Sequence, residues 1–275
     1  MRESYLGSHL GVILVTTNLI SLASKFLVVK YDPGINDQTL KVAFLDLDDE
    51  DATKNCQLPD FPIKLFNAVG GFTKNGPLIC SGAESKSSYS KKCYIFKKEQ
   101  KKFVEHSKIS LEKEVTEASS IVSNDGQLWI TGGYYWTNDY LKSTALITKE
   151  GKTNSTELKE HVYGHCVTRI NARTAILTGG YFYENFFEKG NSKSTFLIDL
   201  ERMEISDGPN LNKARLNHGC TSFKHMGNDV VVVAGGRMGN YDELHSWEFL
   251  DLSGNELSWQ IAGPGRTLTF LIKCV

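Results

Sequence analysis

The sequence lacks the features by which several classes of protein are recognised. Helical periodicity is nearly absent, and the one stretch that fits a short helix, Ser110–Ala118, falls where an outer strand and its connection are expected. Neither sign of charge dominates, because 31 basic residues balance 32 acidic ones to a net charge of −1. The chain is therefore not a helical protein, and no overall field directs it to nucleic acid or to an anionic membrane.

Motifs of common catalytic and metal sites are also missing. The sequence holds no G-x-S-x-G element, no P-loop and no C-x-x-C pair. His161 and His165 are four residues apart, but they precede a predicted strand, in which four residues span ~13 Å, so the two imidazoles cannot share a zinc ion. We therefore predict no enzymatic activity, no cofactor and no metal site.

What is present is a repeat. An apolar run that ends in glycine recurs at Pro77–Gly82, Gln127–Gly133, Arg173–Gly180 and Val230–Gly236. The closing glycines are 51, 47 and 56 residues apart, and the last three runs end in a Gly-Gly doublet. Each run is followed by a loop and a second alternating run, which predicts a β-hairpin. These returning runs are Lys92–Phe96, Ser143–Ile147, Ser194–Ile198 and Ser246–Leu250.

These repeats resemble those of the kelch family, in which about 50 residues form one four-stranded blade of a β-propeller. The doublets match the end of the family's second strand, and Trp259 resembles the tryptophan of its outer strand. Pro209–Arg215, followed by His218, resembles the segment between blades. Phe103 and Met203 stand where two other blades would carry the tryptophan, which departs from the pattern. The resemblance covers about residues 25–265 and implies an all-β, kelch-type β-propeller of about five recognisable blades.

The two ends of the chain fit the repeat less well. Residues 1–23 contain an apolar stretch that ends in Ser21-Leu22-Ala23, and we interpret them as a signal peptide, with the propeller at 24–275. A first buried strand around Gly11–Val15 is the alternative. The last segment, Arg266–Val275, reads as the first strand of a further blade. It either closes a five-blade ring or begins a sixth blade of a truncated one, and we favour truncation.

Six cysteines and the sequon at Asn154 are compatible with a secreted protein. Cys80 and Cys93 flank the loop of one predicted hairpin, so we expect a disulfide between opposite strands. Cys166 and Cys220 begin successive blades, and we expect them to be too far apart to bond. Cys56 and Cys274 have no predicted partner.

Two clusters of charge remain. Lys91, Lys92, Lys97, Lys98, Lys101 and Lys102 form a basic one, and Asp46, Asp48, Asp49, Glu50 and Asp51 form an acidic one. Solvated strand edges and turns are the interpretation we favour for both, since lysine also deters edge-to-edge pairing. Polyanion binding by the lysines and calcium binding by the acidic run stay open as alternatives.

The loops that follow the glycines carry the strongest functional signal. They are rich in Tyr, Trp, Phe and Arg, a composition typical of binding surfaces, and equivalent loops of a propeller emerge on one face. We predict that they bind another protein through Tyr135, Trp136, Tyr140, Tyr183, Phe186, Phe187, Arg237 and Tyr241. Tyr134 and Tyr181, next to the glycines, are expected to pack between blades. An intracellular kelch adaptor and an oxidase are the alternatives to a secreted scaffold.

Overall fold

The computed structural model describes residues 15–16, 25–30, 41–46, 61–63, 65, 67–85, 88–135, 139–148, 150–151, 153–183, 188–225, 227–239, 242–254 and 256–261. Over these ranges the chain is all-β apart from one 3-10 turn, η1 (Lys98–Gln100). No helix in these ranges is long and apolar enough to cross a membrane. Sheet formation by the repeated apolar runs is thus confirmed.

Four antiparallel sheets of four strands follow one another along the chain. The first contains β4 (Val69–Thr73), β5 (Gly76–Ser85), β6 (Ser88–Lys97) and β7 (Lys102–Ser110). The second contains β8 (Ser119–Val122), β9 (Leu128–Thr131), β12 (Ser143–Ile147) and β13 (Thr153–Glu157). The third contains β15 (Cys166–Arg169), β16 (Thr174–Thr178), β19 (Thr195–Asp199) and β20 (Glu204–Asp207). The fourth contains β21 (Gly219–His225), β22 (Asn228–Ala234), β25 (Trp247–Asp251) and β26 (Gln260–Ile261).

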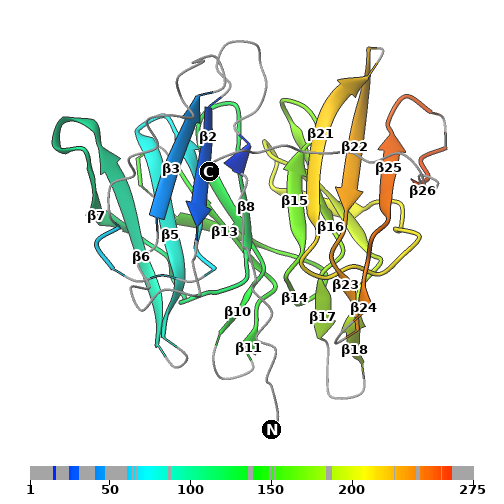
Figure 1. Ribbon diagram of the computed structural model, residues 1–275, viewed down its shortest axis with the longest axis horizontal. Helices are drawn as coiled ribbons and strands as arrows, with labels where there is room; N and C mark the ends of the chain where they lie inside the picture. Colours follow the sequence, from blue (N-terminus) through cyan, green and yellow to red (C-terminus); the bar gives the residue numbers. More distant parts are fainter. Residues whose placement is uncertain are drawn as a thin grey trace, which may run out of the picture.

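The sheets are arranged radially. Their first strands, β4, β8, β15 and β21, lie next to one another in turn, whereas the last strand of each sheet is the outermost. Figure 1 shows the sheets side by side, from β7 at one end to β26 at the other. A further sheet of β1 (Val15–Thr16), β2 (Lys25–Lys30) and β3 (Lys41–Asp46) precedes them in the chain. This architecture is that of a β-propeller, as the repeat predicted.

The cores lie between neighbouring sheets, which explains why the strands read as continuous apolar runs. In β9, Leu128 and Ile130 pack with the first sheet, while Trp129 between them packs with the third sheet. A strand covered on both faces has no polar side to alternate with. The sequence indicated that Trp259 belongs to the last blade. It is 5% exposed and donates its indole N–H to the Pro209 carbonyl at 2.8 Å.

Short connectors join the outer strand of one sheet to the inner strand of the next. Each begins with a buried leucine, at Leu111, Leu158 or Leu211, and contains one residue with positive φ six positions later, at Glu117, Gly164 or Asn217. The Gly164 amide donates to the Glu117 carbonyl, and the Asn217 amide donates to the Gly164 carbonyl at 2.7 Å. Successive connectors are therefore tied to one another across the blades.

Two disulfides are present, and one of them corrects a prediction. Cys80 and Cys93 lie directly opposite each other in β5 and β6 and are bonded, with an S–S distance of 2.03 Å, as expected. Cys166 and Cys220, which we expected to remain apart, are also bonded, at an S–S distance of 2.05 Å. The prediction was wrong because radial sheets converge at their inner strands. There β15 and β21 bring the two Cα atoms to 5.9 Å, within reach of a disulfide.

Several predictions fall outside the described residues. These are the acidic run beyond Asp46 and the further strand at Arg266–Val275, and Cys56 and Cys274, for which no partner was predicted, also lie there. Of the proposed signal peptide, only the β1 backbone is described, where Val15 pairs with Leu27.

Candidate functional site

The glycine doublets turn the chain where neighbouring blades meet. Gly132 and Gly133 have φ of +56° and +97°, and Gly179 and Gly180 have +55° and +99°. A Cβ on Gly180 would lie 2.6 Å from Cγ2 of Val162, in the connector that precedes this sheet. The positive φ and the lack of space together require glycine here. In the degenerate first copy, the same left-handed turn begins at a serine, Ser81, with φ of +63°.

Beyond each doublet the chain forms a small projecting sheet. The second blade carries β10 (Tyr134–Tyr135) with β11 (Asp139–Tyr140), and the fourth carries β23 (Arg237–Met238) with β24 (Asp242–Glu243). The third carries β17 (Tyr181–Tyr183) between β14 (Val162–Tyr163) and β18 (Lys189–Asn191). Figure 1 shows all of them at the same end of the molecule, below the large sheets. We call this end the doublet-loop face.

A row of tyrosine rings crosses the doublet-loop face. The rings of Tyr134 and Tyr163 meet edge to face with centroids 5.2 Å apart, and those of Tyr163 and Tyr181 are 5.3 Å apart. All three side chains are half-buried. Tyr134 and Tyr181 thus pack against a residue of the connector between their blades, as expected of residues beside the glycines. The row joins the second blade to the third in one aromatic surface.

Other aromatic contacts extend this surface on both sides. Tyr89 of the first blade and Tyr135 of the second blade have ring centroids 6.1 Å apart. Burial and the nearby Glu117 carboxylate raise the pKa of Tyr89, so its hydroxyl stays protonated at neutral pH. In the third blade, Nζ of Lys189 lies 5.8 Å from the ring centroid of Tyr183, a cation–π arrangement.

Arg237 occupies in the fourth blade the position that Tyr134 and Tyr181 hold in theirs. Its backbone exchanges two hydrogen bonds with Leu216 of the connector, and its carbonyl accepts from Nδ2 of Asn191 at 2.9 Å. These contacts fix the residue at the edge of the third blade. Among the described residues no acceptor lies within hydrogen-bond distance of its buried Nε–H. The side chain as a whole is half-buried at the edge of the face.

The structure describes part of the predicted binding set. The side chains of Tyr135, Tyr183 and Arg237 lie on the doublet-loop face and are half-buried. Tyr140 lies on this face in β11, where it pairs with Tyr134, although only its backbone is described. The remaining predicted residues lie outside the described ranges: Trp136, Phe186, Phe187 and Tyr241.

Sequence reasoning missed two members of the surface, Tyr89 and Tyr163. Tyr89 was missed because the first copy ends in Ser81-Gly82 and not in a glycine doublet. Tyr163 was missed because it lies in a connector and not in a doublet loop. The signal that could have found Tyr163 is the recurring connector itself. Its fifth residue after the leucine pairs with the residue that follows the doublet, as the bridges Thr116–Tyr134 and Leu216–Arg237 show.

The histidines near the doublets are structural. His165 Nε2 lies 2.7 Å from Oγ1 of Thr131, and His218 Nε2 lies 2.8 Å from Oγ1 of Thr178, so each imidazole joins one blade to the previous one. Burial lowers the pKa of both histidines to about 3. Within the described ranges, no three His, Cys, Asp or Glu side chains are grouped so that they could hold a metal ion.

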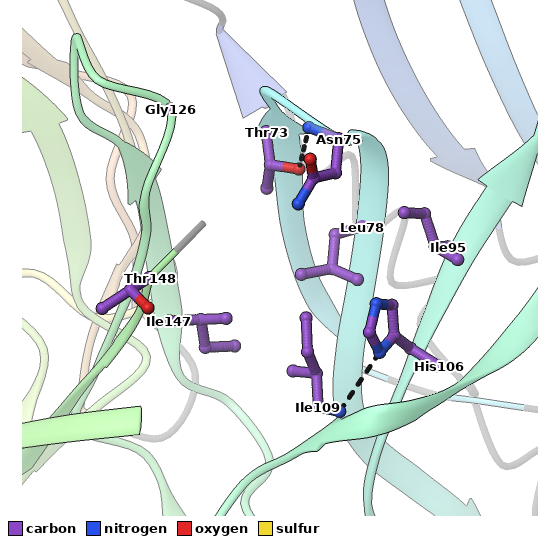
Figure 2. Close-up of a pocket in the computed structure, with 9 residues that line it drawn as sticks. All are labelled: Thr73, Asn75, Leu78, Ile95, His106, Ile109, Gly126, Ile147 and Thr148. Atoms are coloured by element: carbon purple, nitrogen blue, oxygen red, sulfur yellow. Dashed lines mark hydrogen bonds between the residues drawn. The ribbon is translucent and has the colours of Figure 1, made fainter. Parts of the chain in front are cut away.

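A narrow cleft opens between the first and second sheets, toward the end opposite the doublet-loop face. Figure 2 shows the Thr73–Asn75 turn and His106 on one wall and Ile147 and Thr148 on the other. Nδ1 of His106 accepts the backbone N–H of Ile109 at 3.2 Å. The cleft encloses about 10 Å³, enough for roughly one water molecule, so it cannot admit an organic ligand.

Comparison with known proteins supports the fold. No protein-family model and no curated protein matches the sequence. Among solved structures, one described as "Structure of YjhT" is similar, with a TM-score of 0.63 over 85% of this chain and 79% of that one. The two sequences are 10% identical. This likeness shows the fold alone, because propellers carry many unrelated functions.

Proposed function

We propose that this chain is a kelch-type propeller that binds another protein through its doublet-loop face in an oxidising, extracellular environment. The observation that carries the proposal is the aromatic row formed by Tyr134, Tyr163 and Tyr181 across two blades. Tyrosine offers a large contact area at a low entropic cost, and it is enriched among residues that dominate binding energy. Because the rings are in contact across two blades they form one surface, and the half-buried Arg237 lies at its edge.

Two observations favour an extracellular site of action. The Cys80–Cys93 and Cys166–Cys220 disulfides persist in oxidising compartments and are rare in the cytosol. Asn154 of the sequon lies exposed on β13, the outermost strand of its sheet, where a glycan has room. We propose that Asn154 is glycosylated, and a shift in mobility after treatment with peptide N-glycosidase, absent in Asn154→Gln, would show it.

The binding proposal is tested by comparative capture. The wild type and the variant Tyr135→Ala/Tyr183→Ala/Arg237→Ala are immobilised and exposed to extracellular fluid of the source organism, and bound proteins are quantified by mass spectrometry. We expect a protein captured by the wild type to fall about tenfold or more with the variant, because each change removes a contact of the kind that dominates interfaces.

A matched control carries three changes at the outer edge of the third sheet, Glu201→Ala, Arg202→Ala and Glu204→Ala. All three residues are exposed and lie at the end of β19 and β20 opposite Thr178–Gly180, away from the doublet-loop face. This control should capture the partner as the wild type does. Equal capture by all three proteins would overturn the assignment of the doublet-loop face.

An intracellular adaptor is the second candidate, and it predicts reduced cysteines and an uncleaved N-terminus. Mass spectrometry of the protein from its source under non-reducing conditions separates the two. Intact disulfides together with loss of residues 1–23 favour the secreted scaffold.

A further inference from the structure

The turn between β6 and β7 carries an unusual concentration of positive charge. Over the six residues Lys97–Lys102 there are four lysines and a single carboxylate, Glu99, and all six residues are exposed. We call this segment the lysine hairpin. It lies at the end of the first sheet opposite Gly82, hence away from the doublet-loop face.

Within the described part of the chain, no carboxylate forms an ion pair with a lysine of this hairpin. Lys97 and Lys102 pair directly across β6 and β7, an arrangement in which like charges destabilise a sheet. Among the described residues no ion pair involves either of them, whereas Lys92 of the same strand pairs with Glu105 at 2.9 Å. The repulsion between Lys97 and Lys102 is therefore not offset by an ion pair among the described residues, whereas the charge of Lys92 is.

Protection of a sheet edge does not explain the arrangement. Lysines guard an edge when they lie along the outermost strand, which here is β7. Lys98 and Lys101 instead lie in the turn, in or beside η1, where no foreign strand could pair. Lys101 also adopts a left-handed conformation, φ +49°, which glycine or asparagine would adopt more readily. Lys101 therefore holds a backbone conformation that lysine does not favour.

Further cations lie at the same end of the sheet. Leu78 pairs with Ile95, which places the β4–β5 turn and its exposed Lys74 at the same end of the sheet as the lysine hairpin. His106, which lines the cleft in Figure 2, follows the lysine hairpin in β7. Burial and, to a smaller extent, the charge of Lys97 lower the pKa of His106.

We propose that the lysine hairpin and Lys74 form a binding site for a sulfated polysaccharide. The net charge of the chain is −1, so attraction of a polyanion must come from a local cluster of this kind. Compact ammonium groups on flexible stems suit sulfates spaced along a linear chain. Two disulfides place the protein where such polysaccharides occur, outside reducing compartments.

A membrane or a nucleic acid fits this surface less well. The aromatic rings next to the hairpin are largely covered, since Phe103 is 2% exposed and its ring is tilted against that of the half-buried Phe96 with centroids 5.3 Å apart. The exposed large hydrophobic side chains of the described ranges, Phe223, Met238, Leu257 and Ile261, all belong to the fourth blade. The site therefore offers no apolar side chain to insert into a bilayer and no exposed ring on which a base could stack.

The test measures binding of a heparin dodecasaccharide to the intact protein by calorimetry at two salt concentrations. The variant Lys97→Gln/Lys98→Gln/Lys101→Gln/Lys102→Gln should bind about tenfold or more weakly, with a smaller dependence of log Kd on log salt, because fewer counterions are released. A control that loses the same charge elsewhere, Lys113→Gln/Lys159→Gln/Lys193→Gln/Lys224→Gln, should bind within about twofold of the wild type. An unsulfated polysaccharide that keeps its carboxylates should bind the wild type weakly.

Equal binding by the hairpin variant and the control would overturn the proposal, as would stronger binding of the wild type to phosphatidylserine vesicles or single-stranded DNA than to the dodecasaccharide. Near-ultraviolet circular dichroism checks that both variants fold. The inference shares with the proposed function the extracellular location, but the two binding surfaces are tested separately, because the triple variant of the doublet-loop face should bind the dodecasaccharide normally.

Discussion

Glu248 and Arg215 form an ion pair from which water is fully excluded. Oε1 of Glu248 lies 3.1 Å from Nε and 3.0 Å from Nη2 of Arg215, and both side chains are 0% exposed. The carboxylate also accepts the backbone N–H groups of Asn212 and Lys213, and the guanidinium donates to the carbonyls of Gly235 and Ser246. The pair thus joins the third connector to the strands of the fourth sheet.

Removal of one partner of this pair should be far more costly than removal of both. We expect Glu248→Gln to lower the free energy of unfolding by about 3–5 kcal/mol, because the Arg215 charge is left buried without a counterion. The double variant Glu248→Gln/Arg215→Met should lose less than the sum of the single variants. Denaturation in urea measures all three. Additive losses would show that the two side chains act separately.

A matched comparison is the exposed pair Arg173–Glu201, whose side chains are 54% and 61% exposed. Glu201→Gln should leave stability unchanged within error, since solvent screens such pairs.

Acid should destabilise the protein through His165 and His218. Their pKa is about 3 in the folded chain and near 6.5 when unfolded, because burial disfavours the imidazolium. Their contribution to stability is therefore complete above pH 6.5 and is lost as the pH falls toward 3. In that window each histidine should lower the free energy of unfolding by about 1.4 kcal/mol per pH unit.

Urea denaturation at half-unit steps from pH 7 to pH 4 measures this slope. The variant His165→Gln/His218→Gln keeps a side-chain N–H that can reach Thr131 and Thr178, but it cannot bind the protons. Its stability should vary less with pH than that of the wild type. An unchanged slope would assign the acid sensitivity to other groups.

The sequence predicted what depends on local pattern. The glycine doublets indicated where the strands end, and the positions of Cys80 and Cys93 on the two strands of one hairpin predicted their disulfide. The Cys166–Cys220 bond could not be predicted, because it depends on how closely inner strands approach. Tyr163 could have been placed only from the recurring connector, whose leucine lies five residues before it. That connector is hard to recognise in the sequence because its positive-φ residues, Glu117, Gly164 and Asn217, share a conformation but no residue type.

The doublets offer a way to separate backbone conformation from packing. Gly180 has φ of +99°, and a Cβ there would meet atoms of three residues at 2.6–2.9 Å. Gly235 has φ of +67°, and its nearest neighbour would be 3.8 Å away. Gly235→Ala should therefore cost only about 1–2 kcal/mol of conformational energy. Gly180→Ala should cost about 1–3 kcal/mol more, through steric overlap. Equal losses in thermal denaturation would refute the packing argument.

The two disulfides should respond differently to reduction. Cys80 and Cys93 are 0% exposed, whereas Cys166 and Cys220 are half-buried, so a mild reductant should reach the latter pair first without unfolding the protein. Because that bond spans 54 residues, its loss should lower stability by about 4 kcal/mol, while the 13-residue span of Cys80–Cys93 corresponds to about 3 kcal/mol. Alkylation followed by peptide mapping identifies which thiols appear first, and urea denaturation of the half-reduced protein measures the loss. Early alkylation of Cys80 would mean that the first sheet opens more readily than the junction between the third and fourth.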